Sequence, residues 1–309
     1  MIERNLFKKL REYLESKGYK ASIISAKHIP ELRNDVQKYY DNKLYYAPLY
    51  EMYKTYFEFE PKAEFENMTS IISLAKPVPP FKVKLFWKSK HISLLIPPTY
   101  LYGEQIINEA EQDLKAFLNP EGYNVSYALI PQKTLAVRSG LAQYGKNNIT
   151  YISEMGSFHR LIAFYSDLPV EKDNWQELEM MEMCNTCNAC VRKCPTGAIS
   201  GDRFLLYAEK CLTYHNEQPG DIPFPEWIKT SWHNCVVGCL HCQKVCPANK
   251  KVKDWVEPGP TFNENEINFI FNESKFENLP VTLKEKIEKF DLVNYFEVLS
   301  RNFSVFLKI

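Results

Sequence analysis

The cysteines are the sequence feature that most constrains this chain. All nine lie between Cys184 and Cys246, so the rest of the 309-residue sequence contains none. Hydrophobic residues make up 45% of the sequence and charged residues 25%, which fits a folded core and excludes an intrinsically disordered chain. At roughly 150 residues per domain, the length predicts about two domains.

Charge and apolar patterning predict a cytoplasmic protein. The 38 basic and 38 acidic side chains balance, which argues against a chain whose main task is to coat nucleic acid. No apolar run approaches the roughly 20 residues that cross a bilayer, and the N-terminal sequence MIERNLFKKL has no signal-peptide apolar stretch. We therefore expect no membrane partner. In a reducing compartment, clustered cysteines are metal ligands more often than disulfides.

The first cysteine motif has the spacing C-x2-C-x2-C-x3-C-P. It runs from Cys184 through Cys187 and Cys190 to Cys194-Pro195. Bacterial ferredoxins use this spacing to bind [4Fe-4S] clusters: three cysteines hold one cluster and the fourth reaches a second. Structural zinc sites usually take two ligands from each of two cysteine pairs, and they need neither the third cysteine nor the proline. The motif therefore favours iron–sulfur clusters over zinc.

The second motif repeats the last part of the first. Cys239, Cys242 and Cys246-Pro247 give C-x2-C-x3-C-P, which lacks one leading cysteine. Cys211 or Cys235 must supply it; we favour Cys211, but the spacing does not decide between them. The crossed arrangement then predicts two ligand sets. Cluster 1 is held by Cys184, Cys187, Cys190 and Cys246, and cluster 2 by Cys194, Cys239, Cys242 and either Cys211, which we favour, or Cys235.

The cysteine-free N-terminal part predicts a mixture of helices and strands. Apolar residues at helical spacing predict helices over 3–17, 103–118 and 131–141, and residues 31–59 predict helices or irregular surface. Short apolar runs predict strands that together complete one sheet, over 21–25, 68–75, 82–87, 91–96, 123–130, 149–152 and 161–165. The two kinds of element do not alternate strictly, so the predicted class is α+β.

These patterns divide the chain into three predicted parts. Residues 1–175 form an α+β domain that mixes sheet and helix, 176–255 a ferredoxin-like module with two [4Fe-4S] clusters, and 256–309 a helical C-terminal segment. In the last part, apolar residues from Leu283 to Leu299 recur at helical spacing.

Residues Gly140 to Asn147 nearly spell a phosphate-binding loop. The sequence GLAQYGKN matches G-x4-G-K, but Asn147 replaces the hydroxyl residue that would hold magnesium. A predicted helix also precedes this loop and a strand follows it, whereas a P-loop runs from strand to helix. The pattern therefore argues against a nucleotide site, and a plain glycine-rich turn is one alternative.

The same loop resembles a stretch of the epoxyqueuosine reductase family. Residues 138–147, with Gly156-Ser157-Phe158 and Ser166-Asp167-Leu168, are similar to the family patterns A-G-L-G-W-x-G-K-N, G-S-(F/W) and T-D-L. The runs CPTGAI from Cys194, KCLTY around Cys211 and GCLHCQKVCPAN around Cys239 match the same family. The resemblance covers roughly residues 130–250 well and Glu297–Asn302 weakly.

The resemblance implies a reductase that contains a corrinoid. In this family, which is related to the reductive dehalogenases, a nitroreductase-like N-terminal domain places a cobalamin beside two [4Fe-4S] clusters. Electrons pass through the clusters to reduce the epoxide of epoxyqueuosine in tRNA. The resemblance also implies that Cys211 is a cluster ligand, that Cys235 is spare, and that the corrinoid is bound by loop residues Gly140, Leu141, Gly145, Lys146 and Asn147.

One departure from the family pattern bears on catalysis. The family carries a catalytic Asp, the proton donor, shortly before its glycine loop, but residues 124–131 contain no acidic side chain here. Ala142 and Gln143 also replace the family's Gly-Trp pair. Tyr127 is the candidate proton donor in this stretch, as a tyrosine is in the dehalogenases; the alternative is an ordinary strand residue.

We therefore expect an iron–sulfur oxidoreductase that passes electrons through two [4Fe-4S] clusters to cobalamin and reduces an epoxide- or halide-type substrate. The alternative is a ferredoxin-like electron-transfer protein that reduces a corrinoid protein or another partner, so enzymatic activity stays open. Both functions need a low-potential donor of ferredoxin or flavodoxin type. The basic and aromatic residues 81–91 suit a tRNA contact, but they equally describe a half-exposed strand. His233 and His241 are expected to form hydrogen bonds outside the ligand shell.

Overall fold

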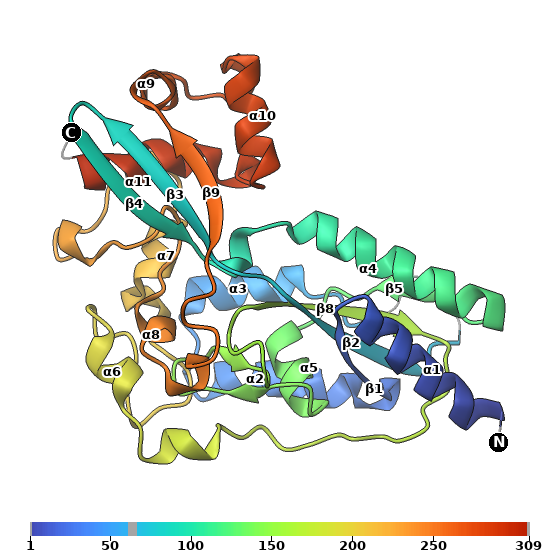
Figure 1. The fold of residues 1–309 in the computed structure, drawn as a ribbon. Helices are drawn as coiled ribbons and strands as arrows, with labels where there is room; N and C mark the ends of the chain where they lie inside the picture. The colour runs from blue at the N-terminus through green and yellow to red at the C-terminus, as the bar shows by residue number, and fades with distance from the viewer. Residues whose placement is uncertain (1, 61–66, 308–309) are drawn as a thin grey trace. The chain divides into compact units, whose positions relative to one another are not determined.

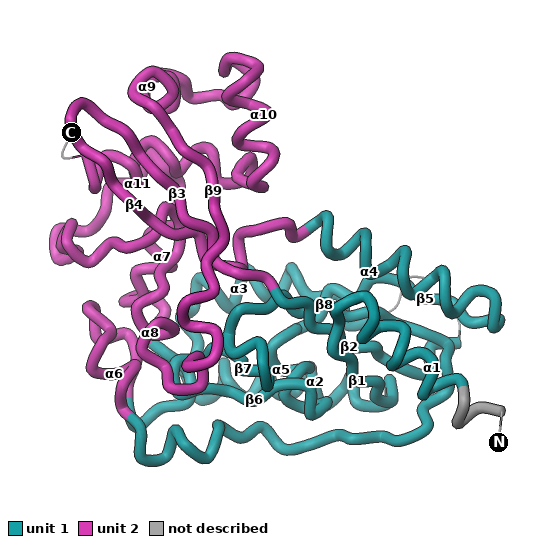
Figure 2. Tube along the Cα trace, viewed as in Figure 1, with its two compact units in different colours: residues 1–77, 104–187, 201–206 teal, residues 78–103, 188–200, 207–309 magenta. Residues whose placement is uncertain are grey.

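A computed structural model describes residues 2–60 and 67–307 of the chain (Figure 1). These residues form two compact units, each assembled from separate stretches of sequence (Figure 2). Unit 1 comprises residues 1–77, 104–187 and 201–206, and unit 2 comprises residues 78–103, 188–200 and 207–309. The three-part division predicted above follows motifs rather than packing, and it stays a prediction.

A four-stranded antiparallel sheet forms the centre of unit 1. Its order is β1 (Lys20–Ser25), β2 (Ser70–Pro77), β8 (His159–Ser166) and β5 (Val125–Tyr127). In β2 the consecutive residues Ile71 and Ile72 are both almost fully buried. Because neighbouring side chains of a strand point to opposite faces, this sheet is covered on both faces.

Helices supply that cover in unit 1. They are α1 (Ile2–Ser16), α2 (Ile29–Asp41), α3 (Ala47–Tyr56), α4 (Gly103–Leu118) and α5 (Gln132–Arg138). Leu32 of α2 and Leu135 of α5 share one buried cluster with Ile24 and Ile71 of the sheet. Helix α4 lies on the other side of the sheet (Figure 1), where Glu109 pairs with Lys76 of β2 at 2.7 Å. The short strands β6 (Gln143–Tyr144) and β7 (Thr150–Tyr151) pair with each other.

Unit 2 contains a smaller sheet and the cysteine region. The sheet order is β4 (Lys90–Ile96), β3 (Phe81–Trp87) and β9 (Glu257–Phe262), with β9 parallel to β3. Three C-terminal helices follow it, α9 (Glu264–Asn272), α10 (Val281–Lys289) and α11 (Phe296–Leu307). Phe262 of β9 packs on Phe303 of α11 with ring centroids 5.5 Å apart. The cysteine region adds short helices α6 (Ala189–Lys193), α7 (Leu212–Asn216) and α8 (His241–Lys244).

The predicted α+β class is confirmed, but the prediction of one sheet is wrong. Strand β3 pairs with β4 on one side and with β9 on the other, and neither β3 nor β4 pairs with β1, β2, β5 or β8. The sequence pattern gave no sign of β9, since Pro258 and Pro260 argue against a strand. An edge position tolerates these prolines, and Gly259 lets the chain come close to β3, where an added Cβ would lie 2.8 Å from the oxygen of Lys82.

The described residues contain no helix that combines the length and the apolar character needed to cross a membrane.

Candidate functional site

The two cysteine motifs fold into two similar short units. Cys190 lies in α6 and Cys242 in α8, and each helix ends within two residues of a cysteine–proline pair. The backbone is extended at both paired cysteines, Cys194 (φ −67°, ψ 113°) and Cys246 (φ −70°, ψ 124°), because a following proline disfavours the helical conformation. Helices α6 and α8 pack against each other. The repeat in the sequence is therefore also a repeat in the structure.

Both candidates for the missing leading cysteine lie near the second motif. Cys211 is half-buried and directly precedes α7, whereas Cys235 is 1% exposed and its main chain bridges to Leu95 of β4. Burial raises the pKa of Cys211 and Cys239, and raises that of Cys235 to about 12. The charges of Cys235, Cys211 and Cys194 raise the pKa of Cys239 further, so these three thiols lie within electrostatic range of Cys239.

This donor set fits iron–sulfur clusters chemically. All nine cysteines lie in the described part of the chain, and none forms a disulfide. Buried thiols with raised pKa values do not ionise alone at neutral pH, but bound iron makes the thiolate the stable form. Within residues 2–60 and 67–307, no three His, Cys, Asp or Glu side chains are arranged to hold a single metal ion. A four-iron cluster spreads its thiolates more widely, because each one binds a different iron atom.

Helix α11 holds the segments that follow Cys211 and Cys235. Arg301 donates hydrogen bonds of 2.9 to 3.1 Å to four main-chain oxygens around the end of α7, those of His215, Asn216, Pro219 and Ile222. The buried Asn302 amide donates to the oxygens of Asn216 at 3.1 Å and Val236 at 2.9 Å. The weak family resemblance at Glu297–Asn302 thus falls on residues that fix α7 and the turn before Cys239.

The Gly140–Asn147 loop directs polar side chains at stretches of unit 1 that adjoin the cysteine region. Lys146 is 6% exposed, and its Nζ donates a hydrogen bond to the main-chain oxygen of Cys187 at 3.2 Å. Asn148, directly after the loop, donates to the main-chain oxygen of Phe204 at 2.6 Å and accepts from the amide of Leu206. Lys146 and Asn148 therefore hold the Cys187 segment and residues 204–206.

The loop is a closely packed connection between a helix and a strand. Helix α5 precedes it and β7 follows it, which confirms the order that argued against a P-loop. Gly140 has φ +72°, and a Cβ there would lie 2.5 Å from Nδ2 of Asn174. Asn147 is 2% exposed and donates to the hydroxyl of Tyr151 at 2.9 Å. The predicted corrinoid-binding role of Gly140, Leu141, Gly145, Lys146 and Asn147 stays a prediction.

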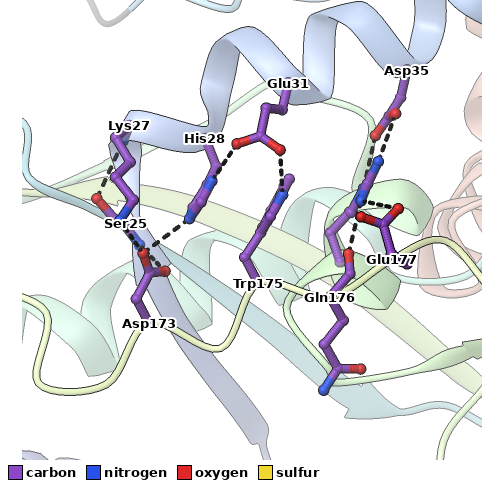
Figure 3. A network of polar contacts seen from close by, with 10 residues as sticks. Ser25, Lys27, His28, Glu31, Asp35, Asp173, Trp175, Gln176 and Glu177 are labelled. Carbon is purple, nitrogen blue, oxygen red and sulfur yellow. Dashed lines mark hydrogen bonds and ion pairs between the residues drawn. The ribbon is translucent and has the colours of Figure 1, made fainter.

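Residues 173–177, called the strap below, are tied to the start of α2 by polar contacts (Figure 3). Asp173 pairs with Lys27 at 2.8 Å and with Nε2 of His28 at 2.9 Å. The Trp175 ring stacks on His28 with centroids 4.4 Å apart, and its indole nitrogen donates to Glu31 at 3.0 Å. The strap continues towards Cys184, so these contacts fix the chain that leads into the cysteine region.

Arg138, at the end of α5, anchors the other end of the strap through Gln176. Its guanidinium donates to both carboxylate oxygens of Asp35, at 3.0 and 2.8 Å, and to the main-chain oxygen of Gln176 at 2.9 Å. The side chains of Arg138 and Asp35 are only 8% and 5% exposed. The sequence reasoning missed Asp35, although an acid between Leu32 and Val36 on the buried face of α2 was a usable signal.

The candidate proton donor Tyr127 lies in the edge strand β5. It is half-buried, its ring meets Phe164 edge-on at 6.0 Å, and burial raises its pKa, so the phenol stays protonated. Ala128 and Ile130, in the stretch where the family has an acid, are buried in the core of unit 1. Among the described residues, Tyr127 forms no hydrogen bond with the Gly140–Asn147 loop.

The two predicted outer histidines lie near the cysteines. His241 contacts the main-chain oxygen of Trp232 through Nε2 at 2.8 Å, and burial lowers the pKa of His233 to about 4. In β3 the Lys82 and Lys84 side chains are exposed while Val83 and Leu85 are buried, which is the pattern of a half-exposed strand.

Comparisons with known proteins identify the cysteine region and the family. Residues 183–249 match a family model described as a 4Fe-4S double cluster binding domain, which confirms the prediction of two such clusters. The chain is 30% identical to the epoxyqueuosine reductase of Cyclobacterium marinum over 232 residues, which are 72% of this chain and 70% of that relative. It is 31% identical to the epoxyqueuosine reductase of Atelocyanobacterium thalassa over 159 residues, but these span 49% of this chain and only 50% of that relative.

A solved structure shares the fold. A crystal structure of epoxyqueuosine reductase with a tRNA-Tyr epoxyqueuosine-modified stem loop matches with a TM-score of 0.70 and 20% identity, over 99% of this chain and 81% of that chain. At 20% identity this structural match establishes the fold alone. The sequence similarity to the Cyclobacterium marinum protein also establishes the family. The chain belongs to the epoxyqueuosine reductase family.

Proposed function

We propose that this protein is an iron–sulfur oxidoreductase whose two [4Fe-4S] clusters feed electrons to a bound cobalamin, for reduction of an epoxide- or halide-type substrate. Membership of the epoxyqueuosine reductase family is the observation that carries the proposal. A bound cobalamin would supply the low-potential metal centre that such reductions need. The chain's own residues hold the clusters, position the corrinoid loop and deliver a proton. Because thiolate ligands need reducing surroundings, we place this function in the cytoplasm.

The proposed cluster ligands are those predicted from spacing, with Cys211 and not Cys235 in cluster 2. Cys211→Ala should lower the iron content from about eight to about four atoms per chain, whereas Cys235→Ala should keep both clusters. Iron analysis and electron paramagnetic resonance of the reduced, anaerobically purified proteins measure this. Loss of a cluster from Cys235→Ala alone would reverse the assignment.

The proposed proton donor is Tyr127, because no carboxylic acid occurs between residues 124 and 131. Its raised pKa keeps the phenol protonated at neutral pH. Tyr127→Phe should abolish substrate reduction but leave iron content and cobalamin binding unchanged. Tyr123→Phe, in the same segment, is the matched control and should stay active. Full activity of Tyr127→Phe would exclude this role.

An electron-transfer function is the second candidate. The observation in its favour concerns the stretch of sequence where the family carries its catalytic acid. In this protein that stretch contains Ala128, which is buried in the core of unit 1. In that case the clusters would reduce a separate corrinoid protein or another partner. A tRNA substrate belongs to the first candidate, since a related enzyme has been crystallised with a modified tRNA stem loop.

Cobalamin binding separates the two candidates. The protein, purified without oxygen, is titrated with hydroxocobalamin while its visible spectrum is recorded. The proposal predicts saturable spectral changes at about one corrinoid per chain. Intact clusters without any cobalamin uptake would contradict the reductase and favour the electron carrier.

A further inference from the structure

The short helices that carry cluster cysteines lie in segments rich in positive charge. Residues 188–200 and 240–253 contain six basic and no acidic side chains, in a chain whose 38 basic and 38 acidic residues balance. All six are exposed. We call them the basic patch: Arg192, Lys193, Lys244, Lys250, Lys251 and Lys253.

The patch is built onto the cysteine motifs themselves. Arg192 and Lys193 lie between Cys190 and Cys194, and Lys244 lies between Cys242 and Cys246. The three remaining lysines follow the short turn Pro247–Asn249 that leaves the second motif. Because α6 and α8 pack against each other (Figure 1), the two motifs that carry these residues belong to one region of unit 2.

Little negative charge compensates the patch. Of its six members, only Lys253 forms an ion pair within the described residues, with Asp254 at 3.8 Å, and both side chains are largely exposed. Exposed pairs of this kind contribute little, so the patch keeps a positive potential. Such a field raises the rate at which an anionic partner meets the surface and orients it on arrival.

We propose that the basic patch is the docking surface for an acidic, low-potential electron carrier protein of ferredoxin or flavodoxin type. This rests on the proposed function, in which the clusters must be reduced from outside. Redox partners form small, weak interfaces, so their orientation depends on charge. In each encounter the carrier is oxidised by one electron and a cluster is reduced by one electron, with no bond formed or broken.

RNA is the other polyanion that such a surface could attract. However, residues 188–200 and 240–253 contain no Phe, Trp or Tyr. Single-stranded RNA is held by aromatic stacking as well as by charge, and this patch offers none within its own segments. The placement of the charges between cluster ligands also serves an electron carrier directly, because it shortens the path from a docked partner to the clusters.

The test measures how fast the clusters of the anaerobic, full-length protein are reduced in a stopped-flow instrument. The donors are a reduced acidic ferredoxin and, for comparison, the methyl viologen radical cation. In the wild-type protein, the rate with ferredoxin should fall steeply as salt increases. The variant Lys193→Glu/Lys244→Glu/Lys251→Glu should be reduced by ferredoxin at least about tenfold more slowly at low salt. Viologen, which is itself a cation, should reduce the variant at least as fast as the wild-type protein.

Lys82→Glu/Lys84→Glu is the matched control, because these lysines are exposed on β3 of the same unit. It should keep the wild-type rate. If ferredoxin reduces the patch variant as fast as the wild-type protein, the proposal is overturned. If that variant also binds tRNA more weakly than the wild type, the patch is assigned to RNA instead. If the patch variant loses iron and cannot be compared, the salt dependence of the wild-type protein still tests the proposal. A rate of reduction by ferredoxin that does not change with salt would overturn it. Clusters that viologen cannot reduce in the wild type would contradict the proposed function itself.

Discussion

At the scale of single residues, the buried ion pair between Arg138 and Asp35 should contribute strongly to the stability of unit 1, where Arg138 also holds the strap. Both side chains are buried, so Arg138→Met leaves a carboxylate without its partner in a poorly solvated place. We expect the unfolding free energy to fall by about 3–5 kcal/mol, as measured by urea unfolding. Arg33→Met, on the helix that carries Asp35, is the control, since the Arg33–Glu60 pair is exposed, and it should cost about 1 kcal/mol or less. Equal losses in the two variants would contradict this account.

The carboxylates that contact His28 predict a pH dependence. The hydrogen bond with His28, followed by that from Trp175, lowers the pKa of Glu31. Burial alone would raise the pKa of Asp173, but hydrogen bonds from Lys27, Ser25 and His28 lower it on balance. A carboxyl group with a lowered pKa stabilises the fold above its unfolded pKa of about 4, and this contribution is lost as the pH falls through the folded value.

The destabilisation caused by Asp173→Asn should therefore be complete at neutral pH and shrink below about pH 4. Urea unfolding of wild type and variant at a series of pH values gives this difference directly, and Asp41→Asn on the exposed end of α2 serves as the control. A difference that grows as the pH falls would have the wrong sign for this account.

Removing the charge of Lys146 should change the midpoint reduction potential of one cluster. Its ammonium donates to the main-chain oxygen of Cys187, a proposed ligand of cluster 1, and positive charge beside a cluster favours the reduced state. Lys146→Met should therefore make the midpoint potential of one cluster more negative. Lys133→Met is the control, since Lys133 is exposed and donates to the main-chain oxygen of Asn148, the residue directly after the loop. The midpoint potentials of both variants are measured by redox titration monitored by electron paramagnetic resonance. An equal shift in the two variants would reject a specific role for Lys146.

At the scale of elements, α11 holds the segment that follows Cys211, a proposed ligand of cluster 2. Arg301→Ala removes hydrogen bonds to four main-chain oxygens around the end of α7, which begins directly after Cys211. We expect partial loss of iron, towards about four atoms per chain, and faster bleaching of the remaining clusters in air. Ser304→Ala, one turn further along α11, should keep all its iron. A fully loaded Arg301→Ala protein would show that α11 does not support the cluster.

Local elements followed from the sequence, but their pairing did not. The helix over 103–118 was located by its apolar spacing, because that pattern depends only on neighbouring residues. The predicted strand 123–130 shortened to β5, Val125–Tyr127, and the C-terminal helical pattern divided into α10 and α11, with Asp291 in a left-handed conformation between them. The partner of β3 is β9, about 175 residues further along the chain, and no local pattern contains that information.

At the scale of the whole molecule, the cysteine spacing predicted the chemistry and the long-range contacts determine how it is supported. Because the ligands of one cluster come mostly from one short motif, their spacing is visible in the sequence. The contacts of Lys146 with Cys187 and of Arg301 with His215 join segments 41 and 86 residues apart, so only the folded structure reveals them. Asp35 was missed for the same reason, since its partner lies 103 residues away.

The central claim is that this chain holds two [4Fe-4S] clusters and a corrinoid together. The most direct measurement takes one anaerobic sample, equilibrates it with hydroxocobalamin, removes the excess by gel filtration, and counts iron, acid-labile sulfide and corrinoid per chain. We expect about eight iron atoms, about eight sulfides and about one corrinoid per chain. About eight irons without corrinoid would contradict the reductase, and about four irons or fewer, or stoichiometric zinc, would contradict the double cluster itself.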